Sequence, residues 1–168
     1  MLVRHATVED ADALALVHVH AWQKAYAGIV PDHHLAALDP VARARWRRSM
    51  LAEPDRVTAT FVAVDGDAVL GFTDVGPCPD NDTAGTVYAI YVHPDHWRRG
   101  VGRVLMETAL AHLTTDGPRP VRLWVFEANQ PARRFYERHG FVADGAVQVE
   151  EFASRALTEV RYTRPAGA

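Results

Sequence analysis

The chain has 168 residues, of which 48% are hydrophobic and 23% are charged, so its composition is neither that of a disordered chain nor that of a membrane protein. The net charge of -3 argues against general nucleic-acid binding, and the single cysteine, Cys78, excludes an intramolecular disulfide and a cysteine-rich zinc site. The start of the chain has no apolar signal segment, and no apolar run approaches the ~18 residues that span a bilayer. We therefore expect one cytoplasmic domain over residues 1–168 that binds neither a membrane nor nucleic acid.

The first third of the chain predicts a strand followed by helices. Residues 2–5 have the pattern of a short strand. Thr7, with Asp10 three residues later, forms a capping box for an amphipathic helix that ends near Gly28. Two further helical regions follow, and the second starts at Asp39–Pro40, where an N-cap residue precedes a first-turn proline.

The next segment changes from helical to strand periodicity. Residues 58–64 and 68–75 are rich in strand-forming side chains and flank the turn signal Asp65–Gly66, which predicts a hairpin. We expect a polar loop over residues 77–85 and then an apolar, aromatic strand over residues 86–92.

The second half alternates between helix and strand. We expect a helix over residues 100–113, a strand over 121–126, a helix over 131–138, and the last strands at Phe141 and over 156–163. Hairpins followed by a strand–helix–strand–helix run predict an α+β fold with a mixed sheet.

The segment between residues 92 and 104 has the chemistry of a phosphate site. A helix N-terminus carries unpaired N–H groups and positive partial charge, glycines let the backbone approach a phosphate, and arginines add charge-assisted hydrogen bonds. The residues concerned, called the phosphate loop below, are Arg98, Arg99, Gly100, Val101, Gly102 and Arg103. A loop that needs glycine only to turn into a helix is the alternative. A Walker loop is excluded because Arg103–Val104 follows Gly102, and a dinucleotide fingerprint is excluded by Leu105.

Two blocks of sequence carry a family resemblance. Residues 90–94 lead into the phosphate loop, and further on come Asn129, Ala132, residues 134–138 and Gly140–Phe141. Together these blocks resemble the acetyl-CoA motifs of the GNAT superfamily of N-acetyltransferases, over roughly residues 57–142. The front segment, residues 21–28, resembles a small single-domain bacterial branch of that superfamily.

The resemblance implies a fold, a co-substrate and several roles. The fold would be a three-layer α+β arrangement in which a mixed, mostly antiparallel sheet is flanked by helices and splayed at the acetyl-CoA site. The backbone of Ile90, Tyr91 and Val92 and the side chain of Asn129 would bind the pantetheine arm, and the phosphate loop would bind the pyrophosphate. Tyr136 would lie near the CoA sulfur as general acid. Dimerisation is common in the family, so a homodimer is compatible with the resemblance.

The general base is less well defined. At neutral pH an alkyl amine with a pKa of ~10.4 is only about one part in 2,500 unprotonated, a gap of up to ~4.6 kcal/mol, so removal of its proton matters. Many relatives place a glutamate at the position of Thr86, which cannot serve. Glu127 is our candidate, and His20, Tyr88 and a water chain are alternatives. Trp97 also departs from the family pattern, which commonly has Gln or Arg there.

The acceptor side and the histidines complete the predictions. Trp22 and Tyr26 lie four residues apart on one helix face, so they either pack in the core or form an aromatic wall for the acceptor. Paired histidines (His18/His20, His33/His34 and His93/His96) lack cysteine partners, and we expect no metal.

The leading function is transfer of the acetyl group of acetyl-CoA to the primary amine of a small molecule by direct attack in a ternary complex. Acetylation of protein N-termini or lysines and a non-catalytic acyl-CoA-binding module are the alternatives.

Overall fold

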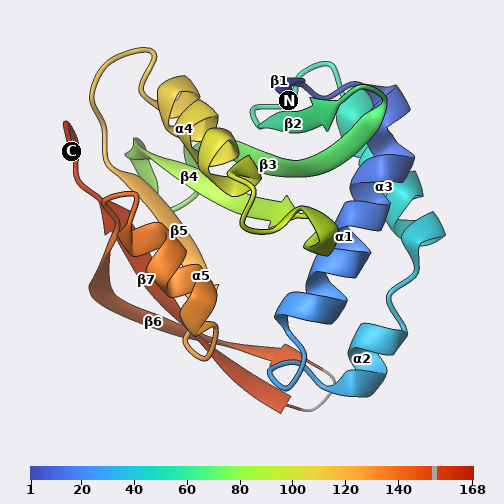
Figure 1. Cartoon of the computed structure of the whole chain (residues 1–168). Helices are drawn as coiled ribbons and strands as arrows, with labels where there is room; N and C mark the ends of the chain where they lie inside the picture. The colour runs from blue at the N-terminus through green and yellow to red at the C-terminus, as the bar shows by residue number, and fades with distance from the viewer. Residues whose placement is uncertain (153–154) are drawn as a thin grey trace.

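A mixed sheet organises the computed structural model, which describes residues 1–152 and 155–168, with only the backbone described at positions 81 and 82. In the described residues the sheet has seven strands in the order β1-β2-β3-β4-β5-β7-β6 (Figure 1). Only β4 and β5 pair in parallel, and every other neighbouring pair is antiparallel. The predicted mixed, mostly antiparallel sheet is therefore confirmed. The strands are β1 (Leu2–His5), β2 (Ala59–Asp65), β3 (Ala68–Cys78), β4 (Asn81–Val92), β5 (Val121–Phe126), β6 (Val142–Phe152) and β7 (Arg155–Arg164).

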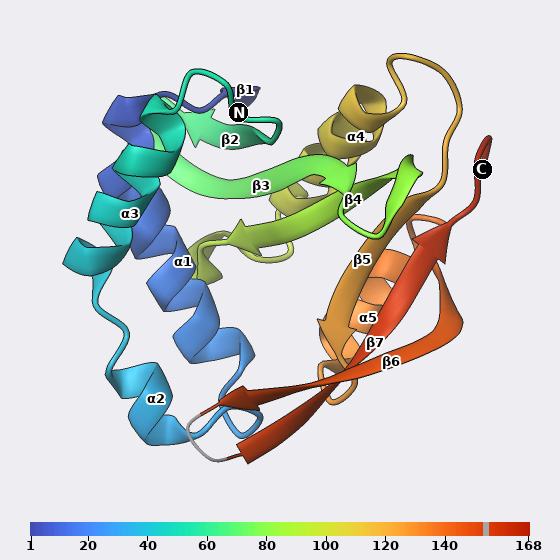
Figure 2. The same cartoon turned by 180° about the vertical axis from the view of Figure 1, so that it is seen from behind.

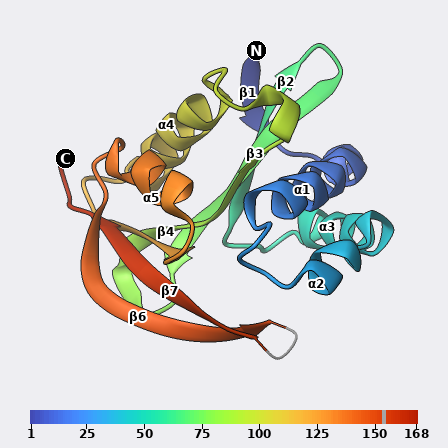
Figure 3. The same cartoon turned by 60° about the horizontal axis from the view of Figure 1, so that its bottom comes forward.

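Helices cover both faces of the sheet. The helices α1 (Ala11–Ala25), α2 (Asp32–Ala36) and α3 (Pro40–Ala52) lie on one side, and α4 (Val101–Leu113) and α5 (Gln130–Glu137) lie on the other (Figures 1 and 3). Short 3₁₀ turns, Val8–Asp10 and Pro94–His96, precede α1 and α4. Among the described residues, no helix is both long and apolar enough to cross a membrane.

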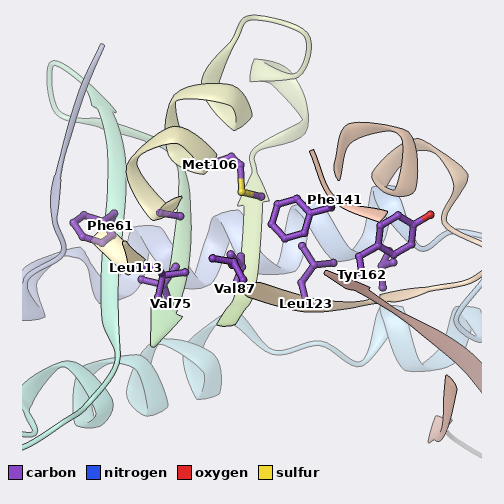
Figure 4. Close-up of a cluster of buried hydrophobic side chains, with 11 residues drawn as sticks. Phe61, Val75, Val87, Met106, Leu113, Leu123, Phe141 and Tyr162 are labelled. Atoms are coloured by element: carbon purple, nitrogen blue, oxygen red, sulfur yellow. The ribbon is translucent and has the colours of Figure 1, made fainter. Parts of the chain in front are cut away.

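Each helical layer buries its own core against the sheet. Beneath α4 and α5, Met106 and Leu113 pack on Val87 and Leu123, together with Phe141 (Figure 4). A second core on the opposite face joins α1 to β2 and β3 and contains Leu14, Val17, Val62 and Phe72. The sheet is thus fixed from both sides.

Predicted helix starts are confirmed where a local cap specifies them. The backbone N–H of Thr7 donates to Asp10 Oδ2 at 2.8 Å, which completes the capping box ahead of α1. The carboxylate of Asp39 accepts from the Val41 N–H at 2.8 Å, with Pro40 in the first turn of α3. Both caps depend on neighbouring residues alone, which is why they could be read from the sequence.

Two sequence predictions about the strands were wrong. The expected loop over residues 77–85 is mostly hairpin, because β3 continues to Cys78, β4 begins at Asn81, and Pro77 pairs with Gly85. Strand pairing within the β3–β4 hairpin here outweighs a polar local composition.

The second error is the omission of β6, since only Phe141 and residues 156–163 were expected as the last strands. The polarity of β6 is inverted: Val147 and Val149 are exposed, while Gln148 between them faces inward. An irregularity in register between Ala143 and Val147, where Gly145 has φ 90°, also breaks the alternation.

Candidate active site

The centre of the sheet opens where β4 and β5 diverge (Figure 2). The two strands pair only at Gly85–Val121 and Thr86–Arg122, although β4 continues to Val92 and β5 to Phe126. Beyond that point, the edge of β4 that faces β5 has backbone N–H and C=O groups without a partner strand. Such an edge can bind an extended ligand as if the ligand were an additional strand.

A bulge lies on β4 at the start of this opening. Asp74 pairs with Ala89 and Val75 pairs with Val87, so Tyr88 is the extra residue on β4. A bulge bends its strand and increases the local twist, and this one comes immediately after the last pairing with β5. The hydroxyl of Tyr88 donates to the carbonyl of Pro77, which ties the bulge to β3.

The phosphate loop has a left-handed backbone at two positions. Arg98 has φ 60° and Gly100 has φ 83°, both in the left-handed region, and α4 begins at Val101. Alternation into the left-handed region turns successive N–H groups inward as a nest, and the first turn of α4 contributes further unpaired N–H groups. A non-glycine residue at positive φ is strained, and such strain is concentrated at functional sites.

Gly102 serves packing as well as the loop. A Cβ atom at this position would lie 3.3 Å from Cε2 of Phe135 and 3.7 Å from Cγ2 of Val92. The absence of a side chain therefore lets the first turn of α4 lie directly on α5 and β4. From the sequence, Gly102 was predicted only to let the backbone approach a phosphate. Its contact with Phe135 could not be predicted, because Phe135 is distant in the chain.

Two other predicted positions make contacts of their own. The Trp97 indole N–H donates to the Val92 carbonyl at 2.8 Å, so this residue covers the end of the open β4 edge. Asn129 is buried, and its Oδ1 accepts from the Ala132 N–H at 3.3 Å as the N-cap of α5.

A cavity of about 1060 Å³ joins these features. It is lined by the predicted cofactor residues Ile90, Tyr91, Val92, Arg98, Gly100, Gly102, Arg103 and Asn129, and by Trp22, Tyr26 and Tyr136. Arg99, Val101 and Glu127 do not line it, and neither does His20. Glu127 is exposed at the end of β5, and the His20 ring nitrogen Nδ1 lies 2.8 Å from His93 Nε2.

Tyr136 lies in the cavity wall beside the core. Its ring centroid is 5.4 Å from that of Phe135 and 6.1 Å from that of Phe141, and burial raises its pKa well above the ordinary value. Its hydroxyl is protonated at neutral pH, as that of an ordinary tyrosine is, and can act as a hydrogen-bond donor in the cavity.

Trp22 and Tyr26 belong to an aromatic wall that also contains Phe126 of β5 and Phe152 of β6. The ring centroids of Trp22 and Tyr26 are 4.8 Å apart, those of Tyr26 and Phe126 5.1 Å, and those of Phe126 and Phe152 5.6 Å. All four rings line the cavity. Trp22 and Tyr26 therefore pack against other rings, as the core interpretation expects, and also present a surface to the cavity.

Several polar residues of the cavity were not predicted. Thr86 Oγ1 and Arg122 Nε are buried without a hydrogen-bond partner in the described part of the chain, at the point where β4 and β5 separate. Gln148 of β6 donates to Glu159 Oε2 of β7 at 2.6 Å, and both side chains line the cavity. The sequence feature that could have indicated this pair is Glu159, an acidic residue inside the predicted strand 156–163. Across residues 1–152 and 155–168, no group of three or more His, Cys, Asp or Glu residues is arranged to hold a metal ion.

Comparisons with known proteins identify the family and the fold. Residues 18–141 match the model of the acetyltransferase (GNAT) family. The chain is 32% identical over 141 residues to the uncharacterized N-acetyltransferase YuaI of Bacillus subtilis, covering 82% of this chain and 78% of that protein. It is 44% identical over 85 residues to the mycothiol acetyltransferase of Geodermatophilus obscurus, a match that covers 48% of this chain and 28% of that longer protein. The PaiA N-acetyltransferase of Thermoplasma acidophilum, solved in complex with coenzyme A, has a similar structure, with a TM-score of 0.75, 17% identity and 98% of each chain covered.

Proposed function

The chain belongs to the GNAT family of acetyltransferases, and from that premise we propose that it transfers the acetyl group of acetyl-CoA to the primary amine of a small molecule. The observation that carries this proposal is the single cavity that runs from the phosphate loop, along the open edge of β4, to the aromatic wall. Its volume of about 1060 Å³ has room for the arm of the co-substrate and for a small acceptor together. Direct attack in a ternary complex needs both to be present at once.

Different residues of the cavity would bind different parts of acetyl-CoA. The backbone N–H groups of the phosphate loop, with the guanidinium groups of Arg98 and Arg103, would hold the pyrophosphate. The open edge of β4 over Ile90–Val92 would hold the pantetheine arm by main-chain hydrogen bonds, and Asn129 lies beside it. Bound in this way, acetyl-CoA supplies an activated acyl group as a thioester.

Two parts of the protein would assist the transfer. A backbone N–H on the open edge of β4 would donate to the carbonyl oxygen as negative charge develops on it, in the manner of an oxyanion hole. Tyr136, which lines the cavity and whose hydroxyl is protonated at neutral pH, would give a proton to the departing sulfur.

The boundary of the aromatic wall favours a small acceptor over a protein. Phe152, near the tip of the β6–β7 hairpin, approaches both Trp22 of α1, with ring centroids 6.0 Å apart, and His34 of α2, at 5.5 Å. The hairpin therefore forms one boundary of the part of the cavity beside the aromatic wall, where the acceptor would bind (Figure 3).

Binding of acetyl-CoA can be tested by thermal unfolding. At 100 times its Kd, acetyl-CoA should stabilise the protein by about 2.7 kcal/mol, which raises the Tm of a chain of this size by roughly 5–10 °C. Arg98→Asn removes a guanidinium at the cavity but keeps a residue that tolerates positive φ, and it should weaken binding about tenfold. Arg99→Asn is the matched control, because Arg99 is an exposed arginine in the same loop outside the cavity. An equal Tm shift in wild type and Arg98→Asn would contradict the assignment of this loop.

The reaction itself is tested by thiol release from acetyl-CoA across a panel of small amines and peptide N-termini. We expect turnover with small amines. Turnover with peptides alone would favour the protein-acetylating alternative, and binding without any thiol release would favour a non-catalytic module.

A further inference from the structure

Glu159 is an acidic side chain that is half-buried in the wall of the cavity. It lies in the middle of β7, pairs with Phe126 of β5 on one side and with Gln148 of β6 on the other, and lines the cavity. The Gln148 side-chain N–H donates to Oε2 at 2.6 Å, which fixes the carboxylate, while Oε1 has no protein donor among the residues described. One oxygen is thus held in place and the other is available to a ligand.

The surroundings of this carboxylate suit an organic cation. Phe126, its neighbour across the strand pair, belongs to the aromatic wall. Ring faces attract a cation, and a carboxylate beside them supplies the opposite charge. The rings also offer apolar surface for the body of a ligand whose charged end is at Glu159.

Glu159 lies beside the opening between β4 and β5, beyond the point where the two strands separate. β4 and β5 separate after Thr86–Arg122, and Phe126 is four residues further along β5, or about 13 Å at the usual rise of a strand. Burial raises the pKa of Tyr26, with further contributions from Tyr91, Tyr136 and Glu159. The carboxylate, Tyr26 and the candidate general acid Tyr136 therefore influence one region of the cavity.

From these contacts we infer that Glu159 binds the ammonium group of the acceptor and takes its proton, and that the acceptor is a cationic primary amine with a ring-bearing apolar body. This inference rests on the proposed function. It assigns the general base to a residue of β7 that neither the sequence motifs nor the family resemblance indicated.

The electrostatics of the site are compatible with a base. Burial raises the pKa of Glu159, an effect opposed by the Gln148 hydrogen bond and increased by Glu150 of β6. Other titratable or charged groups that line the cavity include Lys24 and Tyr26 of α1, Tyr91 of β4, Arg122 of β5, Tyr136 of α5 and Arg161 of β7. Arg161 is paired with Asp144 at 2.8 Å. A carboxylate with a raised pKa is a stronger base than an exposed one.

The ammonium nitrogen gives one proton to Glu159 Oε1 and becomes a neutral amine. Its lone pair forms the C–N bond to the thioester carbon, the C–S bond breaks, and the sulfur receives a proton from Tyr136. The second proton lost by the nitrogen restores Tyr136, and the proton on Glu159 passes to water after the product leaves.

Glu159→Gln tests the inference with 2-phenylethylamine as the probe and n-butylamine as the ring-free comparison. The glutamine can still accept from Gln148, so folding should be preserved. We expect kcat/KM for 2-phenylethylamine to fall at least about 10²-fold and the acidic limb of its pH profile to disappear, with the acetyl-CoA Tm shift unchanged. Glu151→Gln, an exposed glutamate on the same hairpin that does not line the cavity, is the matched control and should remain within about threefold of wild type.

Other results would contradict the role of Glu159, the acceptor class or the proposed function. A Glu159→Gln protein with kcat/KM within about threefold of wild type would overturn the role of the carboxylate. Wild-type protein that binds acetyl-CoA but does not acetylate 2-phenylethylamine, or that acetylates n-butylamine equally well, would overturn the acceptor class and leave the proposed function standing. Wild-type protein that does not bind acetyl-CoA would overturn the proposed function, and this inference with it.

Discussion

A buried histidine beneath the cavity should make the stability of this protein depend on pH. His18 of α1 is 6% exposed, and its ring stacks on Trp22, with centroids 5.3 Å apart, and meets the ring of Tyr91 edge-on at 5.0 Å. Neither ring nitrogen has a hydrogen-bond partner within the described residues. Burial, together with the charges of Arg43 and Arg47, lowers the pKa of His18 to about 3.

The sign and size of the effect follow from linkage. Because the pKa of His18 in the folded protein is below its unfolded value of about 6.5, the unfolded state binds more protons between these values. The stabilisation is fully present above pH 6.5 and is lost as the pH falls toward 3. Between pH 7 and pH 5 the free energy of unfolding should decrease by about 2 kcal/mol through this residue alone, a large part of the ~5–15 kcal/mol that holds a typical domain folded.

His18→Phe isolates this contribution, because it keeps a ring between Trp22 and Tyr91 but cannot titrate. Urea unfolding followed by tryptophan fluorescence at pH 7 and pH 5 should show a decrease that is about 2 kcal/mol smaller in the variant than in wild type. His33→Gln, at an exposed histidine of α2, is the control and should behave as wild type does. Equal pH dependence in wild type and His18→Phe would refute the reasoning, since His18 would then titrate as it does in the unfolded chain.

Three further predictions concern the site and its support. Tyr136→Phe should lower kcat about 10²-fold at saturating acetyl-CoA without changing its affinity, and a loss under about threefold would make Tyr136 structural. Glu127→Gln should leave turnover within about threefold of wild type, because Glu127 lies outside the cavity, and a large loss measured by thiol release would restore it as the base. Asp74→Ala should destabilise the fold by about 3–5 kcal/mol in urea unfolding, because Arg47, 2% exposed and 2.8 Å from Asp74, would become an unpaired buried charge; a change under about 1 kcal/mol would contradict this.

The parts of the fold that the sequence predicted are those specified by neighbouring residues. The strand at Val121–Phe126 has the bounds expected from its apolar pattern, and the helix after Asp39 begins at its cap. The phosphate loop could also be recognised, because its glycines and arginines lie next to one another in the chain. Its left-handed conformation at Arg98 could not, since an arginine has no local preference for positive φ.

The parts that were missed are those whose side-chain pattern or place in the sheet differs from what the local sequence indicates. β6 has its valines on the exposed face and Gln148 toward the cavity, so its pattern suggested no strand with an apolar buried side. Glu159 could be assigned to a strand, but not to the cavity, because its place beside Phe126 follows from the strand order β5-β7-β6. The candidate base therefore depends on topology, whereas the phosphate site depends on a motif.

The same topology gives a physical reason for an acid on β7 instead of at position 86. Thr86 pairs with Arg122 where β4 and β5 separate, and Nε of Arg122 is buried there without a hydrogen-bond partner within residues 1–152 and 155–168. A carboxylate at position 86 would lie beside this cation, which lowers a carboxyl pKa and weakens the group as a base. Glu159 instead has Glu150 nearby and is partly withdrawn from water, and both effects raise its pKa. Deprotonating an alkyl ammonium costs up to ~4.6 kcal/mol at neutral pH, so the site with the raised carboxyl pKa is the one better suited to that step.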